Sequence, residues 1–513
     1  MTTVAEITGH LRNPTEADKL LIEKAFDLAA EAHKEHKRYS GEPYMSHVAA
    51  VALRLAEMGM GPRTIAAGLL HDTIEDTVVT ADIIRETFGE EILFLVEGVT
   101  KLSSVRYYGS DRHNESLRKL FVATSQDIRV LIIKLVDRLH NMLTLEHVPK
   151  EKQVRIARET LEIYVPVAHR LGIGLIRKEL EDLAFPYVYP EEFARVEETI
   201  KSIMAKAKIT LERERKSLQK NLAEAGIIDF HTSYRVKGYY SLYHKLKRKD
   251  WNVDLIYDLL ALRVVVSTVE QCYQTLGLIH KIWRPLPGRM KDYIAFPKPN
   301  GYQSIHTTVT TPNGTILEIQ IRTETMHNEA EYGVASHLMY KDTTDNISGS
   351  GWFGKMAPAL FRPFAWRAER KTQKQISTEA DHRERIPTWI SQIGEMYTKE
   401  KSTSQEFVDD MRADFFSDRI FVFTPNGDVI DLPKGASPVD FAYAIHSEIG
   451  NKMAGAKVNQ KLVSLDTQLR NGDIVEIQTK RNAKPSTRWV AIAKTSVAKR
   501  RIKNALAEEQ DNV

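Results

Sequence analysis

The chain has little of what marks secreted, membrane or disulfide-bonded proteins. It contains one cysteine, Cys272, among 513 residues, which excludes an intrachain disulfide and a cluster of thiolate zinc ligands. Its most apolar run, Val130 to Val136, is short and is interrupted by Lys134, so it is typical of a core segment. The polar N-terminus has no apolar stretch of the kind that signal peptides carry. We therefore expect a cytoplasmic protein without a membrane partner.

The chain also lacks internal repeats, low-complexity tracts and an excess of charge of one sign. Its net charge of +4 is small for this length and neither indicates nor excludes nucleic acid, because only local patches matter for such binding. What the chain does have is length, which at about 150 residues per domain suggests three or four domains. The hydrophobic fraction of 42% is enough to give each domain a core.

Hydrophobic periodicity divides the chain into regions of different character. The first ~190 residues read as helices throughout, and a long charged helix follows and ends at Gly226. Further on, β-branched and alternating segments indicate strands between helices, as in Thr315 to Thr323. An Asn426-Gly427 hairpin, a helix from Ser437 to Gly450 and a closing strand suggest a β-grasp module. The expected order is an all-α domain (1–195), an α/β domain (196–340), a linker with helical segments (341–413), the β-grasp module (414–480) and a basic helical tail (481–513).

The stretch AAGLLHDTIEDT (residues 66–77) gathers an imidazole and three carboxylates on successive helical turns. Like charges at this spacing repel by a few tenths of a kcal/mol, so a bound cation is the expected compensation. Two histidines and two aspartates from three helices suit Mn²⁺, Fe²⁺ or Zn²⁺, which activates a water for attack on phosphorus. Glu75 and Asp76 would orient that water or take its proton. The candidate ligands are His47, His71, Asp72 and Asp137.

The alternative for this first constellation is a solvated helix face with core histidines. An isolated His-Asp pair favours that alternative, because short motifs match by chance. The additional ligands and the Glu-Asp pair shift the balance toward a metal site.

A second constellation is basic. Lys237, Ser241 and Lys245 recur every four residues, so on a helix they share one face that suits a polyphosphate. Asp258 before one strand and Glu318 on the polar face of another are positioned to hold Mg²⁺ on a nucleoside triphosphate, although alternation alone leaves Glu318 as an ordinary exposed carboxylate. The side chains expected around the nucleotides are Arg235, Lys237, Ser241, Lys245, Arg289, Lys291, Lys298, Tyr302 and His306.

The first constellation resembles HD-family phosphohydrolases, and more closely the hydrolase domain of long RelA/SpoT-type alarmone enzymes. The resemblance implies that the four candidate ligands bind Mn²⁺ and that Glu75 and Asp76 form the catalytic acid pair. It also implies that Arg38, Asn141 and Thr144 contact the nucleotide. The family usually has a second basic residue where this chain has Tyr39, which weakens one expected phosphate contact.

The string KDYIAFPKPNGYQSIHT, with EIQIRT and MHNEAEYGVASH, resembles the synthetase signature of the same family. The resemblance implies a nucleotidyltransferase-like fold that moves the β,γ-pyrophosphate of ATP to the 3′-hydroxyl of GDP or GTP. In it Asp258 and Glu318 serve Mg²⁺, and Glu318 is also the base. The RMKD tetrad from Arg289 resembles the variant of bifunctional members. Tyr234 replaces a usual Gly and Gly238 a usual His, and both replacements are expected either to lower synthetase activity or to alter the placement of ATP.

The segment from 414 to 480 resembles a TGS domain, a β-grasp fold whose helix carries a histidine that meets the tRNA 3′ end; His446 matches it. A surface histidine without a ligand remains the alternative. The family continues beyond this domain into modules that dock on the ribosome, so firm ribosome docking is not expected of this chain.

Together the motifs predict a bifunctional enzyme of the stringent response that makes and hydrolyses (p)ppGpp. Two rivals remain open: a hydrolase whose synthetase site has weakened, and an RNA-binding regulator that uses both nucleotide sites as sensors. The long helical region from 190 to 226 is the expected coupler of the two sites.

Overall fold

The structure is a computed structural model that describes residues 2–103, 127–256, 260–298, 300–341, 419–427, 429–480 and 482–510. The chain divides into two compact units, one made of residues 1–104 and 128–348 and the other of residues 105–127 and 349–513. The expected linker lies almost entirely outside the described residues, and so does Asp258. Among the described residues, no helix is both long and apolar enough to cross a membrane.

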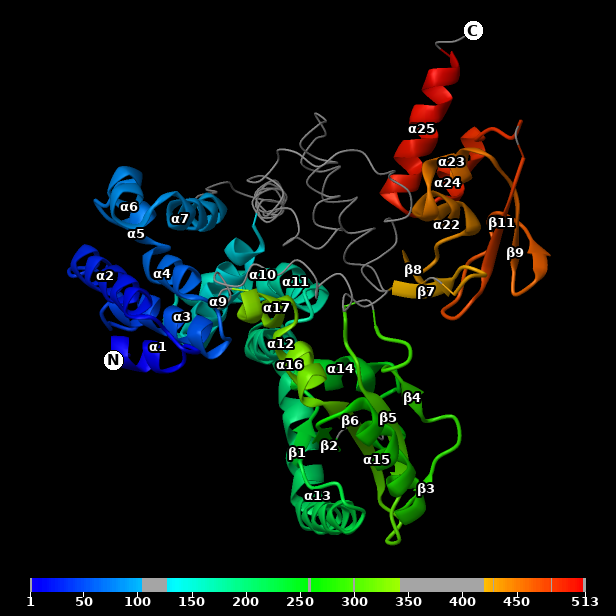
Figure 1. The fold of residues 1–513 in the computed structure, drawn as a ribbon, viewed down its shortest axis with the longest axis horizontal. Coiled ribbons are helices and arrows are strands. Elements are labelled where there is room, and N and C mark those ends of the chain that lie inside the picture. Colours follow the sequence, from blue (N-terminus) through cyan, green and yellow to red (C-terminus); the bar gives the residue numbers. More distant parts are fainter. Residues whose placement is uncertain are drawn as a thin grey trace. The chain divides into compact units, whose positions relative to one another are not determined.

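The N-terminal part of the first unit is all-helical, as expected, and we call it the helical region (Figure 1). Its helices are α1 (Val4–Gly9), α2 (Glu16–Ala32), α3 (Met45–Glu57), α4 (Pro62–Leu70), α5 (Thr73–Asp76), α6 (Ala81–Phe88), α7 (Glu90–Ser103), α9 (Ile128–Leu143), α10 (Lys150–Glu159), α11 (Val165–Arg170) and α12 (Gly174–Val188). Short helical turns span Leu145–His147 and Thr160–Tyr164. Apolar faces of α3, α4 and α9 pack together, and this core holds the ends of these helices in place.

The rest of the first unit is the sheet region. It begins with the long helix α13 (Pro190–Glu224), which ends beside Gly226 in a left-handed conformation (φ 81°), as the charged periodicity predicts. The other helices are α14 (Tyr239–Lys247), α15 (Val269–Ile282), α16 (Glu324–Tyr332) and α17 (Val334–Lys341). The strands are β1 (Phe230–Val236), β2 (Leu260–Val266), β3 (Arg284–Pro285), β4 (Lys291–Asp292), β5 (Ile305–Thr310) and β6 (Ile316–Thr323).

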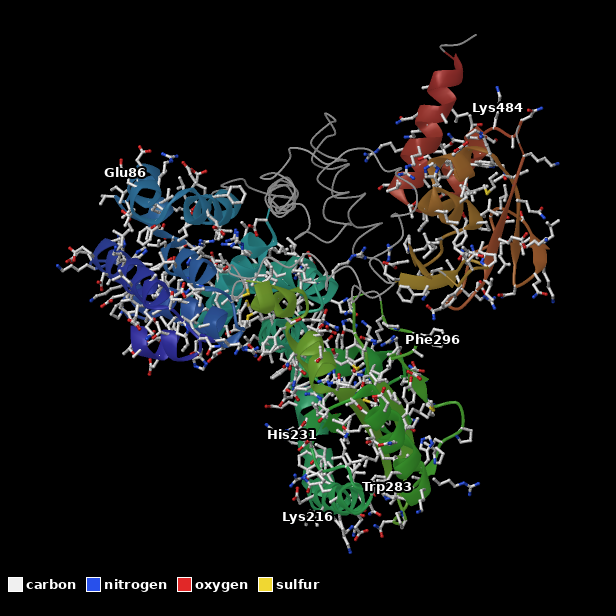
Figure 2. The ribbon with its side chains drawn as sticks, viewed as in Figure 1. Glu86, Lys216, His231, Trp283, Phe296 and Lys484 are labelled. Atoms are coloured by element: carbon white, nitrogen blue, oxygen red, sulfur yellow. The ribbon has the colours of Figure 1, made fainter. Side chains whose placement is uncertain are left out.

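These strands form one mixed sheet in the order β1-β2-β6-β5-β3, with β4 paired to β5; only β2 and β6 run parallel. One face is apolar, and residues such as Leu262, Ile319 and Trp283 pack there against α13 and α15 (Figure 2). The other face is polar. The register places Arg235, Ala261 and Glu318 in one row, so strand alternation collects the charged side chains on this face.

Helix α12 joins the two regions, because it packs against α9 and α11 on one side and against α13, α14 and α16 on the other. Near the N-terminal end of α12, two segments of the chain approach closely: the Val334 amide donates to the Leu171 carbonyl at 3.0 Å. The junction therefore lies between the last helices of the helical region and the helices around the sheet.

The described part of the second unit has a hairpin, four helices and a three-stranded sheet, and its first elements follow the order expected of a β-grasp fold. Its elements are β7 (Arg419–Phe423), β8 (Val429–Pro433), α22 (Pro438–Ile445), α23 (Ser447–Asn451), β9 (Met453–Val458), β10 (Lys461–Val463), β11 (Val475–Thr479), α24 (Thr487–Ile492) and α25 (Ser496–Gln510). The segment expected as a basic tail is helical but shares a core with α22 through Trp489 and Ile502. The buried Asp440 accepts hydrogen bonds from the Lys494 and Thr495 amides just before α25.

Candidate metal centre and nucleotide site

The stretch around His71 is not one continuous helix, contrary to the sequence-based expectation. Helix α4 ends at Leu70, and α5 begins at Thr73. The Thr73 hydroxyl donates to the Leu70 carbonyl at 2.7 Å, a local bond that competes with the helical pattern. As a result, His71 and Asp72 lie in the break between two helices and not on a regular helical face.

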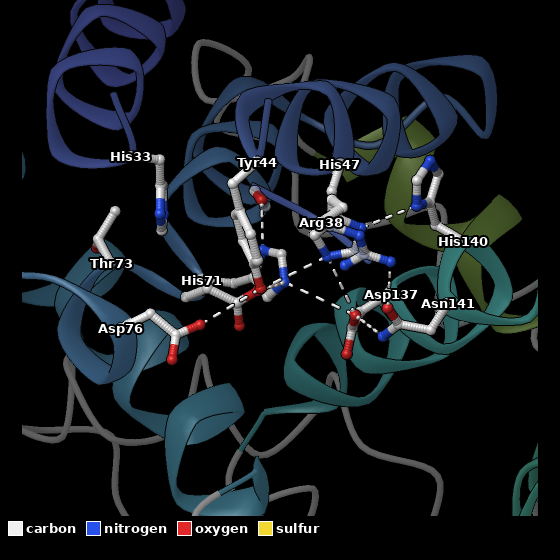
Figure 3. Close-up of polar contacts among 12 residues, drawn as sticks. His33, Arg38, Tyr44, His47, His71, Thr73, Asp76, Asp137, His140 and Asn141 are labelled. Atoms are coloured by element: carbon white, nitrogen blue, oxygen red, sulfur yellow. Dashed lines mark hydrogen bonds and ion pairs between the residues drawn. The ribbon is translucent and has the colours of Figure 1, made fainter. Parts of the chain in front are cut away.

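Three segments converge on a buried pocket of nitrogen and oxygen atoms. His47 lies on α3, His71 follows α4 and Asp137 lies on α9, and each offers a ligand atom within 4.8 Å of the others (Figure 3). Nε2 of His47 lies 3.4 Å from Oδ1 of Asp137. Asp72 joins the group, because its Oδ2 lies 3.0 Å from Nε2 of His71 and 3.6 Å from Nε2 of His47.

The two histidines fit a metal. Nε2 of His47 and Nε2 of His71 are buried and make no hydrogen bond in spite of the nearby carboxylates. The other ring nitrogens are engaged: Nδ1 of His71 lies 2.8 Å from the Gly68 carbonyl, to which it donates, and Nδ1 of His47 lies 2.9 Å from Nδ1 of His140. This is how metal-bound imidazoles are usually oriented, with one nitrogen fixed and the other aimed at the ion.

The electrostatics of the pocket also suit a cation. Burial opposes charge on His71, but Asp72 and Asp137 outweigh it and raise its pKa to about 10. Burial likewise opposes ionisation of Asp137, yet Lys134 and the two histidines hold its pKa well below its usual value. In the absence of an ion, protons on imidazole thus balance the carboxylates. A divalent cation offers the same compensation.

The predicted substrate residues of this site do come together. The Arg38 guanidinium donates to Asn141 Oδ1 at 2.8 Å and to the Thr144 hydroxyl at 3.0 Å. Asn141 in turn donates to Asp137 Oδ1 at 2.6 Å, so this cluster adjoins the metal pocket. Thr144 directly follows α9 and is not part of the helix.

The acid pair lies on the short helix α5, beside the pocket. Partial burial and the charge of Asp72 raise the pKa of Asp76, although both Asp76 and Glu75 are exposed on this turn. The sequence reasoning missed two residues here. Tyr44 donates to Asp72, and Lys134 forms a buried ion pair with Asp137 at 2.7 Å. A lysine within the apolar run of α9 was the available signal for that pair.

A chain of polar contacts crosses the polar face of the sheet. Arg235 donates to Gln320 Oε1 at 2.8 Å, Gln320 donates to Glu318 at 3.3 Å, and Nδ1 of His306 lies 2.8 Å from Glu318 Oε1. The Tyr302 hydroxyl lies 2.8 Å from Nε2 of His306. Glu318 is therefore buried, with only 9% of its surface exposed, and is not an ordinary exposed carboxylate. It lies between Arg235, which is expected to bind ATP, and His306, which is expected to bind the acceptor nucleotide.

The loop between β4 and β5 brings a lysine over aromatic rings. Nζ of Lys298 lies 4.7 Å from the ring centre of Tyr293 and 4.9 Å from that of Tyr302. Burial of this ammonium, together with Lys291 and other cations, lowers its pKa to about 8. Arg289, just before β4, and Lys291, in β4, are exposed and extend the basic surface.

Helix α14 carries the expected polyphosphate residues, with a correction and an addition. Lys237 precedes the helix and does not share its face with Ser241 and Lys245, because α14 begins only at Tyr239. The addition comes from α12, where the buried Glu181 accepts a hydrogen bond from the Ser241 hydroxyl at 2.9 Å.

Gly238 and Tyr234, the two residues that depart from the family's synthetase pattern, each lie beside an acidic residue. The neighbouring Asp182 accepts from the Tyr240 amide at 3.3 Å, and a Cβ at Gly238 would lie 3.0 Å from its Oδ1. Tyr234 bonds to Glu212 of α13, on the side of β1 opposite Arg235.

Comparison with known proteins agrees with this architecture. The chain matches the HD domain over residues 25–174, the region found in RelA/SpoT proteins over residues 234–345, and the TGS domain over residues 420–479. The chain therefore contains an HD domain, a region found in RelA/SpoT proteins and a TGS domain. The three matches fall on the helical region, the sheet region and the β-grasp module in the predicted order.

Several curated relatives are similar over most of this chain. A guanosine-3′,5′-bis(diphosphate) 3′-pyrophosphohydrolase of Aquifex aeolicus is 42% identical over 95% of the chain and 65% of the relative. A GTP pyrophosphokinase of Myxococcus xanthus is 42% identical over 96% of the chain and 61% of the relative. The bifunctional (p)ppGpp synthase/hydrolase SpoT of Escherichia coli is 40% identical over 94% and 64%. The chain thus spans less than two thirds of the length of each of these relatives.

In the TGS domain, His446 is not inside a helix as expected. It is exposed and extended (φ −163°, ψ 144°) between α22 and α23, and it caps the second helix. Its Nδ1 accepts from the Glu448 amide at 3.2 Å, so in the neutral ring the hydrogen sits on Nε2. The ring therefore presents an N–H donor away from the helix.

Proposed function

We propose that this chain is a RelA/SpoT-type protein that carries two opposed activities on guanine nucleotides. The helical region hydrolyses the 3′-pyrophosphate of (p)ppGpp, and the sheet region transfers pyrophosphate from ATP to the 3′-hydroxyl of GDP or GTP. The relatives that bear both kinds of name support this reading, and so do the two separate sites. Cytoplasmic location remains a prediction from the sequence.

The observation that carries the hydrolase half is the pair of orphaned, buried Nε2 atoms of His47 and His71 beside two carboxylates. We assign Mn²⁺ to this set, with Asp72 and Asp137 as oxygen ligands. Such an ion lowers the pKa of a water and neutralises phosphoryl charge. Asp76, whose pKa is raised by partial burial and by the charge of Asp72, is suited to take a proton from that water.

The substrate is held beside this centre by the chain's own residues. Arg38 presents a guanidinium that Asn141 and Thr144 hold in place, which suits a phosphate of (p)ppGpp. Glu75, exposed on α5, assists Asp76 in orienting the water. Tyr39 lies next to Arg38 in the chain and supplies no second cation there.

The observation that carries the synthetase half is the buried Glu318 between Arg235 and His306 on the polar face. Glu318 accepts the proton of the acceptor 3′-hydroxyl, and with Asp258 it holds Mg²⁺, which neutralises phosphate charge. Arg235, Lys237, Ser241 and Lys245 bind ATP; Arg289, Lys291, Lys298, Tyr302 and His306 bind the guanine nucleotide. In-line displacement needs mainly positioning and charge neutralisation, which this basic face provides.

Nucleotide chromatography on the purified chain tests both halves. One tube holds ATP, GDP and Mg²⁺, and the other holds ppGpp and Mn²⁺. Synthesis should disappear in Glu318→Gln and persist in His71→Ala, and hydrolysis should show the reverse, so each variant is the control for the other. Loss of ppGpp without any synthesis would instead identify the hydrolase with a weakened synthetase. No change in either tube would contradict both activities.

A second candidate function is binding of deacylated tRNA by the TGS domain. The exposed Nε2–H of His446, fixed by its bond to Glu448, is the feature that favours it. Filter binding with deacylated tRNA should weaken in His446→Ala and stay unchanged in His231→Ala, an exposed histidine of the sheet region. Equal binding by both variants would refute this role. Tight binding without turnover would favour the nucleotide-sensing regulator.

A further inference from the structure

A tyrosine hydroxyl lies between the metal pocket and the acid pair. The Tyr44 hydroxyl is 2.7 Å from Oδ2 of Asp72 and 3.3 Å from Oδ2 of Asp76 (Figure 3). The Asp72 oxygen that it contacts is the same oxygen that faces the two histidines. One phenol therefore touches both an expected metal ligand and an expected catalytic carboxylate.

The tyrosine ring is held on several sides. It stacks on His33 with ring centres 4.7 Å apart and an angle of 23°, and it meets His47 edge-on at 5.6 Å. The Tyr44 amide donates to the His36 carbonyl at 2.9 Å, which fixes the backbone just before α3. A ring clamped in this way keeps its hydroxyl in one place.

The hydroxyl lies between two carboxylates that repel each other. Asp72 and Asp76 follow each other by one helical turn, so their negative charges repel. A phenol keeps its proton at neutral pH and has one hydrogen to donate. The shorter contact assigns that hydrogen to Asp72, which fixes the direction of this carboxylate and screens it from Asp76.

We propose that Tyr44 is a positioning residue of the metal centre, which holds the Asp72 carboxylate toward His47 and His71 and sets Asp76 beside it. This inference rests on the proposed hydrolase function. Loss of a residue that orients a metal ligand typically lowers metal affinity 10- to 100-fold. The ring itself is needed only for packing, so phenylalanine removes the hydroxyl and keeps the stack on His33.

Calorimetric titration of the metal-free full chain with Mn²⁺ tests the proposal. Tyr44→Phe should bind Mn²⁺ about 10- to 100-fold more weakly than the unmodified chain. The matched control is Tyr273→Phe, which removes a tyrosine–carboxylate bond of 3.0 Å to Asp292 in the sheet region and should leave Mn²⁺ affinity unchanged. At saturating Mn²⁺, Tyr44→Phe should lower kcat for ppGpp hydrolysis with little change in KM, because the Tyr44 hydroxyl no longer holds the Asp76 carboxylate in position.

The possible outcomes separate the positioning role of Tyr44 from the metal site and from the hydrolase activity. Unchanged Mn²⁺ affinity in Tyr44→Phe overturns the proposal, and so does an equal loss in Tyr273→Phe, which would indicate a general loss of structure. Failure of the unmodified chain to bind Mn²⁺ overturns the metal site and the proposal together. Weakened Mn²⁺ binding in Tyr44→Phe, with no ppGpp hydrolysis by the unmodified chain, supports the positioning role and refutes the proposed hydrolase activity.

Discussion

A methyl group added at Gly333 tests how the helical region and the sheet region are joined. Gly333 lies in a backbone conformation that essentially only glycine adopts (φ 55°, ψ −130°). A Cβ there would lie 2.1 Å from the Leu171 carbonyl oxygen and 2.4 Å from the carbonyl carbon of Gly172. Backbone atoms cannot turn aside as the end of a flexible side chain can, so the two segments must separate.

Alanine substitutions at two other glycines separate the cost of backbone strain from the cost of steric overlap. Gly314 also has a positive φ (76°), but a Cβ there meets nothing within 4 Å, so Gly314→Ala measures backbone strain alone, about 1 kcal/mol. Gly174 has an ordinary φ, but its Cβ would lie 2.4 Å from the Ala330 carbonyl oxygen, so Gly174→Ala measures overlap alone, about 2 kcal/mol. Gly333→Ala combines both effects and brings its Cβ within 3 Å of three backbone atoms where Gly174→Ala meets one, so it should lower the free energy of unfolding by about 4 kcal/mol.

Urea unfolding and hydrogen exchange provide the assay. With a urea m-value of about 3 kcal/mol/M, Gly333→Ala should lower the unfolding midpoint by more than about 1 M. The Val334 amide, bonded to the Leu171 carbonyl, should lose protection in Gly333→Ala and keep it in Gly314→Ala. The reasoning is refuted if Gly333→Ala is no less stable than Gly314→Ala and Val334 keeps its protection.

Further predictions concern charge and competition. Because burial lowers the pKa of Lys298 to about 8, its ammonium is lost above that pH, and calorimetry between pH 7 and 9 should show GDP affinity falling with pH in the unmodified chain but not in Lys298→Arg. Glu181→Ala frees the hydroxyl of Ser241 and should tighten ATP binding about fivefold, the equivalent of one hydrogen bond; unchanged or weaker binding contradicts this. Asp137→Asn leaves Lys134 buried without its carboxylate and should lower the unfolding free energy of the metal-free chain by about 3 kcal/mol; Lys134→Met added to it should recover most of that loss, and no recovery contradicts the pairing.

Sequence periodicity predicted the regular elements well, because their causes are local. The alternation around Glu318 correctly placed its side chain on the polar face of β6, and Gly226 correctly marked the end of α13. Where a single side-chain bond competes with a helix, the prediction was wrong. The helix ends before His71, and the expected helix through His446 divides into two.

Contacts between distant segments were beyond the reach of sequence spacing. Tyr44 and Asp72 are 28 residues apart, and Glu181 and Ser241 are 60 apart, so only the packing of whole helices brings them together. Neither Tyr44 nor Glu181 stood out by residue type. The candidate metal ligands did, because two histidines and two aspartates in or beside apolar helices have few other uses.

One labelled time course can show whether a single chain both makes and hydrolyses ppGpp. The unmodified chain is mixed with ATP labelled at the β-phosphate, GDP, Mg²⁺ and Mn²⁺. We expect the label to move first into ppGpp and then into free pyrophosphate. Glu318→Gln should block the first transfer, and His71→Ala should make labelled ppGpp accumulate. Pyrophosphate that forms from ATP without a ppGpp intermediate, or ppGpp accumulation unaffected by His71→Ala, would contradict two opposed activities in one chain.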